Sequence, residues 1–107
     1  MAKKDIFANK LATLLGRREI ANRDIFDIWF FAKEDWSINY ELVEERTDLG
    51  FDKYIEKCIK VLEKMPEKYI LSGMGELLDN KLKIWAKDNL KKETIFHLKL
   101  LRESLEL

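Results

Sequence analysis

Residues 5–31 read DIFANKLATLLGRREIANRDIFDIWFF and contain two helical patterns separated by a short polar link. In the first pattern, apolar side chains recur at three- and four-residue steps and predict a helix from about Asp5 to Leu15, which Gly16 ends. The second pattern begins near Asn22, a residue type that caps helix N-termini, and is apolar around nearly its whole circumference. We therefore expect a second helix that is central and buried, and that folds back beside the first because the link is short.

The rest of the chain predicts a helical scaffold around this pair, with no strand alternation and no internal repeat. The further expected elements are a helix at about 38–46 capped by Ser37, a helix at about 51–65 ended by Pro66, a loop at 69–75 that still buries its apolar residues, and a helical region at about 77–105 with a break near Asp88–Asn89. The prediction is one all-α domain over residues 1–107, a compact bundle of about five to six helices. Residues 3–32 would form a motif-bearing helix pair and residues 37–107 its scaffold.

Composition excludes several classes of protein. A chain of 107 residues with 47% hydrophobic and 37% charged residues favours one packed domain over disorder. Lys plus Arg equals Asp plus Glu at 20 each, so no net basic footprint for nucleic acid is predicted. The single cysteine, Cys58, excludes an internal disulfide. The first residues lack the apolar core of a secretory signal, and no apolar run reaches the roughly 18 residues of a membrane span. We expect a cytoplasmic protein that does not enter a membrane.

The charged residues within 10–27 are the candidate site. Asp27 lies at helical spacing between two phenylalanines, so its carboxylate is partly desolvated and needs a cation. Arg23, one turn earlier, is the local partner, and an Arg23–Asp27 ion pair would be an ordinary structural contact. Lys10 flanks the apolar stripe of the first helix and reaches Asp24 and Asp27 if the two helices are antiparallel, which suits a phosphate ligand as well as a surface lysine. The residues alone leave the structural and the phosphate-binding interpretation open, and they contain neither a metal-ligand cluster nor a glycine-rich phosphate loop.

Two segments of this stretch together resemble motifs of the AbiEii nucleotidyltransferase toxins, the toxin halves of abortive-infection, type IV toxin–antitoxin pairs. The segment KLATLL at 10–15 is similar to that family's third motif, K-L-x-A-L-L, with Thr13 and Leu14 shifted from the commonest spacing. The segment RDIFDI at 23–28 is similar to the fourth motif, R-D-hydrophobic-x-D-hydrophobic. The resemblance covers about the first quarter to third of the chain, and the remainder matches only as a helical tail.

The resemblance assigns a role to each charged residue of the two segments. It implies that Lys10 contacts the phosphates of the nucleotide and that Arg23 is a further nucleotide-binding residue. It also implies that Asp24 and Asp27 are catalytic residues that help to hold the site, one of them as the base for the attacking acceptor hydroxyl.

The family's first half has no counterpart in the sequence, which lacks a G-S motif and the strand-borne paired carboxylates that bind Mg²⁺ and the triphosphate. The resemblance therefore implies the C-terminal helical domain of a nucleotidyltransferase, inactive alone because the metal clamp is missing. Its parent would use Mg²⁺ to move a nucleoside monophosphate from a nucleoside triphosphate (NTP) to an RNA or protein acceptor. The implied partners are the missing N-terminal nucleotidyltransferase domain, a cognate antitoxin and the RNA acceptor, with self-association through the exposed docking surface. The alternative is a stand-alone helical protein-interaction module with no active site.

Overall fold

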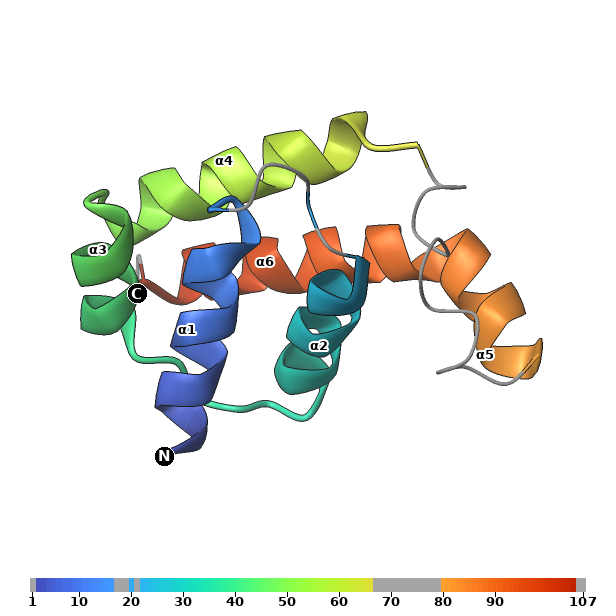
Figure 1. Cartoon of the computed structure of the whole chain (residues 1–107), viewed down its shortest axis with the longest axis horizontal. Helices are drawn as coiled ribbons and strands as arrows, with labels where there is room; N and C mark the ends of the chain where they lie inside the picture. The colour runs from blue at the N-terminus through green and yellow to red at the C-terminus, as the bar shows by residue number, and fades with distance from the viewer. Residues whose placement is uncertain (1, 17–19, 21, 67–79, 106–107) are drawn as a thin grey trace.

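The computed structural model describes residues 2–16, 20, 22–66 and 80–105. These residues form six α-helices and one π-helical turn, as the helical spacing of the apolar residues predicts for most of the chain (Figure 1). The elements are α1 (Lys3–Leu14), α2 (Asn22–Lys33), α3 (Tyr40–Thr47), α4 (Phe51–Lys64), α5 (Asn80–Trp85), the π-helical turn η2 (Ala86–Leu90) and α6 (Lys91–Leu105). The described residues contain no strand, so the all-α prediction is confirmed for them. None of the helices in this part of the chain combines the length and the apolar character that a membrane span requires.

Most expected helices begin and end close to their predicted bounds, and one cap was wrong. The residue that caps α3 is Asn39, not Ser37: its Oδ1 accepts a hydrogen bond from the Leu42 amide (3.1 Å), and its Nδ2 donates to Asp5 on α1 (2.9 Å). Because Asn39 is tied to α1, α3 starts two residues later than predicted and Ile38 is buried ahead of it. The predicted break near Asp88–Asn89 falls within η2. The predicted loop at 69–75 lies outside the described residues.

The core forms where apolar stripes of several helices meet. Helices α1 and α2 lie side by side and run in opposite directions, while α6 packs against both α2 and α4 (Figure 1). The largest fully buried side chains come from α1, α2, α3, α4, η2 and α6: Phe7, Leu11, Leu14, Ile25, Ile28, Val43, Ile55, Leu62, Leu90 and Leu98. Helix α2 is not surrounded on all sides as the sequence predicts, because Phe30 is 39% exposed. Helices α1 and α6 pack against other sides of α2, and Trp85 of α5 packs on Trp29.

Side chains from neighbouring helices satisfy the polar groups at helix ends. The Tyr54 hydroxyl of α4 donates to the Leu11 and Ala12 carbonyls at the C-terminal end of α1 (2.6 and 3.0 Å). The Glu44 carboxylate of α3 accepts from the Phe51 amide at the start of α4 (2.8 Å). The Lys91 ammonium of α6 donates to two carbonyls at the other end of α4, 2.9 and 2.8 Å away. These bonds replace water at groups that no helix can satisfy internally, and they fix how the helices meet.

Tyr54→Phe removes the hydroxyl at the end of α1 and leaves two carbonyls without that donor. We expect a loss of about 1–3 kcal/mol in the free energy of unfolding, because Leu11 is fully buried and its carbonyl loses this donor away from water. Urea denaturation measures it. Tyr40→Phe is the matched control: Tyr40 packs its ring edge-to-face on Phe51 at 4.7 Å, and its hydroxyl has no hydrogen bond within the described residues. An equal loss in both variants would contradict the capping role.

Alkaline pH should destabilise the protein, because α4 buries two groups that lose a proton at high pH, the Tyr54 hydroxyl and the Cys58 thiol. Burial raises the pKa of the Cys58 thiol to about 12 from its ordinary 9.0, and burial also raises the pKa of Tyr54 above its ordinary 10.0. Both groups keep their protons longer in the folded state, so their contribution is complete below pH 9.0 and is lost as pH rises toward the folded values. One such group lowers the free energy of unfolding by about 1.4 kcal/mol per pH unit. Denaturation between pH 8 and 11 tests this, and Cys58→Ala should show a shallower decline; an unchanged slope would refute the assignment.

Candidate functional site

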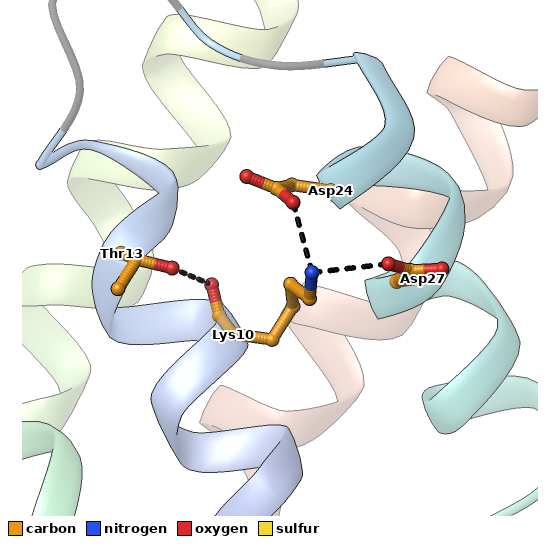
Figure 2. A network of polar contacts seen from close by, with 4 residues as sticks. All are labelled: Lys10, Thr13, Asp24 and Asp27. Carbon is orange, nitrogen blue, oxygen red and sulfur yellow. Dashed lines mark hydrogen bonds and ion pairs between the residues drawn. The ribbon is translucent and has the colours of Figure 1, made fainter. Parts of the chain in front are cut away.

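Lys10, Asp24 and Asp27 form one ion cluster between α1 and α2. Lys10 lies one turn after the buried Phe7 on α1, so its stem follows the edge of the apolar stripe while its ammonium extends toward α2. The two aspartates are three residues apart on α2, a spacing that places them on the same side of the helix. The Lys10 Nζ lies 3.0 Å from Asp24 Oδ1 and 3.1 Å from Asp27 Oδ2 (Figure 2). The structure therefore brings together three of the four predicted site residues.

The two carboxylates lie in different environments. The Asp24 side chain is 4% exposed, whereas the side chains of Asp27 and Lys10 are 31% and 29% exposed. A buried carboxylate is costly unless it is paired, and Asp24 is stabilised by the Lys10 ammonium and by its position in the first turn of α2, where the helix dipole favours an acid. Burial lowers the pKa of Lys10, but hydrogen bonds and charge from Asp24 and Asp27 outweigh it, so the pKa is raised above its ordinary 10.5. Lys10 is charged throughout the physiological range.

The predicted Arg23–Asp27 ion pair is wrong. Arg23 is exposed, and Asp27 is paired with Lys10 rather than with Arg23 in the described part of the chain. Helical geometry explains the difference: Asp27 lies on the side of α2 that faces α1, and Arg23 is rotated toward solvent. Arg23 therefore presents a guanidinium without a carboxylate partner among the described residues.

Asp27 is partly desolvated, as predicted, but the sequence analysis missed that Asp24 is the more deeply buried carboxylate. A usable signal was present. Asp24 precedes Ile28 by four residues and Phe31 by seven, so it shares their stripe on the helix, and Ile28 is fully buried. Asp27 instead lies on the edge between that stripe and the open side.

The chemistry available at the cluster is that of a positioned cation. A lysine ammonium has three N–H donors, and the aspartates engage two of them within the described residues. The third can donate to an oxyanion that approaches from the exposed side. No group of three or more His, Cys, Asp or Glu side chains that could hold a metal ion occurs in the described residues.

A shallow pocket near α1 does not include this cluster. The pocket has a volume of about 350 Å³ and is lined by Ala12, Thr13, Gly16 and Arg46. Neither Lys10 nor the two aspartates of α2 belong to that lining. The ion cluster is a surface site between two helices.

Comparison with known proteins adds no further assignment. No protein-family model, curated protein or solved structure matches this chain. The functional interpretation of the cluster therefore depends on its geometry and on the resemblance of its two segments.

Lys10→Met keeps the apolar stem of the side chain and removes its charge, so it leaves Asp24 buried without the ammonium. We expect a loss of about 1–3 kcal/mol in the free energy of unfolding. Asp27→Asn should cost less than about 1 kcal/mol because Asp27 is partly solvated. Arg23→Gln should change stability by no more than about 0.5 kcal/mol, since it breaks no described contact. Thermal and urea denaturation rank the three variants, and a larger loss for Arg23→Gln than for Lys10→Met would show that this account of the cluster is mistaken.

Proposed function

We propose that the chain is the C-terminal helical domain of an AbiEii-like nucleotidyltransferase, and that the ion cluster is its share of the nucleotide site. The proposal depends on one observation: the segments 10–15 and 23–28, which resemble the third and fourth family motifs, contact each other through their charged side chains. Lys10 of the first and Asp24 and Asp27 of the second are far apart in sequence, yet one ammonium contacts both carboxylates. A shared site requires this proximity, although an interhelical ion cluster in a scaffold has it too.

The different burial of the cluster's members suggests a division of roles. Lys10 would donate its remaining N–H to a phosphate oxygen, and the exposed Arg23 would add a second phosphate contact. Asp27 is the carboxylate that solvent reaches, so it is the better candidate to accept a proton from an acceptor hydroxyl. Asp24 is buried and would act as a positioning residue that holds the ammonium.

The reaction of the proposed parent needs groups from outside this chain. Divalent metal ions neutralise the phosphate oxygens in nucleotidyl transfer, and their ligands would come from the N-terminal domain. This domain, a cognate antitoxin and an RNA or protein acceptor are the proposed partners, and the proposed location is the cytoplasm. The chain alone would be inactive as an enzyme.

A second candidate function is a stand-alone helical interaction module. The same cluster favours this candidate if its role is structural, because the ion pairs of Lys10 join α1 to α2 whether or not a nucleotide binds. Several large apolar side chains are also exposed, the most exposed being Ile84 and Phe96. Such a surface would dock the missing domain under the first proposal and an unrelated protein under the second.

Nucleotide binding separates the two candidates. Because this chain supplies phosphate contacts without the metal site, we expect binding of magnesium-loaded ATP in about the millimolar range. In titration NMR of the labelled chain, the Lys10 and Arg23 signals should shift, and Arg23→Gln should weaken binding several-fold without destabilising the fold. Arg46→Gln, which changes another exposed arginine, is the matched control and should bind as the unchanged chain does.

The DNA upstream of the coding sequence provides an independent test. The proposal expects a G-S motif and paired carboxylates encoded directly upstream, in frame or in a split reading frame, and rejoining the two parts should tighten nucleotide binding. An unrelated neighbouring gene with its own promoter, together with no shift at Lys10 or Arg23, would favour the interaction module.

A further inference from the structure

The open side of α2 carries a cation and an aromatic ring in one line. Arg23 and Phe30 are seven residues apart. Seven residues turn the helix by about 700°, which is about 20° short of two full turns, so both side chains leave the helix in nearly the same direction. The rise along the helix between them is about 10 Å. Asp27 lies between them and binds Lys10 at 3.1 Å, so the ammonium borders the same strip. We call Arg23, Asp27 and Phe30 the open strip of α2.

Phe30 is the unexpected member of this strip. Its neighbours on α2 in sequence, Trp29 and Phe31, pack inward, with Trp29 buried and Phe31 stacked at 4.3 Å on Trp36. Phe30 is 39% exposed, and its described ring contact is the edge-to-face one with Phe31, 6.3 Å between centroids. The ring is thus held from one side by a second aromatic ring while part of it meets water. An aromatic side chain fixed in this way is pre-ordered for stacking.

We infer that Phe30 is the stacking surface for the base of a nucleotide whose phosphates bind Arg23 and Lys10. The inference rests on the proposed function, because it assigns the base of the same ligand. The spacing fits this ligand: a mononucleotide presents a flat apolar base at one end and anionic oxygens at the other. On α2, Arg23 lies about two turns from the Phe30 ring, and the Lys10 ammonium lies beside Asp27, about one turn from the ring. A free phosphate would use only the cationic end.

Stacking has a consequence for specificity. Every base has a π-face, whereas discrimination between bases requires hydrogen bonds to their edges. A site that holds the base through Phe30 accepts all four nucleotides and prefers the purines, which stack more strongly. We therefore assign this half-site a nucleotide class, nucleoside triphosphates with a purine preference, rather than one base.

The test compares nucleotides with a ligand that has no base. The labelled chain is titrated with ATP, GTP, CTP, UTP and inorganic triphosphate, each with equimolar Mg²⁺, and the aromatic signals of Phe30 are followed beside those of Lys10 and Arg23. We expect ring-current shifts at Phe30 with the four nucleotides, largest for ATP and GTP, and none with triphosphate. Phe30→Ala and Phe30→Leu should weaken ATP binding about tenfold and leave triphosphate binding unchanged, whereas Phe30→Trp should retain ATP binding. Phe96→Ala, which removes another exposed phenylalanine, is the matched control and should change neither.

The outcomes separate this inference from the proposed function. If nucleotides and triphosphate both shift Lys10 and Arg23 but never Phe30, the base lies elsewhere, the inference is overturned and the proposed function stands. If no ligand shifts Lys10 or Arg23, the proposed function fails and the inference fails with it. Because the Phe30 shift is measured in the unchanged chain, a variant that folds poorly does not obscure the result.

Discussion

The structure depends on a constraint set by helix length. The longest helix of the described residues, α6, has 15 residues, and isolated helices of this size are marginal in water. Each helix therefore depends on its neighbours in two ways: they cover its apolar stripe, and they supply hydrogen bonds to the unpaired backbone groups at its ends. Tyr54 shows both at once, because its ring is buried in the core while its hydroxyl donates to two carbonyls of α1. The order of the helices in space follows from contacts of this kind.

At the contact between α1 and α2, the neighbouring helix also supplies the charge that a buried carboxylate needs. Burying Asp24 costs desolvation energy that the ammonium and the helix dipole offset, and well-packed apolar residues often stabilise such a contact at least as well as an ion cluster does. Stability alone therefore gives little reason for a lysine with two aspartates here. The two carboxylates do, however, hold the ammonium in a fixed position before any ligand arrives, and a phosphate site uses donors that are ordered in this way. This argument supports the proposed function without depending on the resemblance.

The sequence predicted what depends on local spacing and missed what depends on neighbours. The bounds of α2 and α4 follow from apolar periodicity and from breakers such as Gly50 and Pro66, so they were predictable. The cap of α3 was not, because Asn39 is selected over Ser37 by its contact with α1. At the site, the approach of Lys10 to the aspartates was predictable from a short antiparallel link. The burial of Asp24 could have been predicted from the stripe that it shares with Ile28. The exposure of Phe30 depends on which sides of α2 are covered by other helices, and no local pattern specifies that.

The uncovered side of α2 is where the fold and the proposed function meet. A helix with apolar residues on nearly every side would be buried completely in a larger assembly, yet here Phe30 stays partly in water beside an arginine without a described carboxylate partner. Exposed single phenylalanines are common and need no explanation by themselves. The combination is more informative, because the strip places a cation and a ring about two helical turns apart on one side of α2. This arrangement suits a small ligand with one flat apolar end and one anionic end, which is why we assign the strip to a nucleotide.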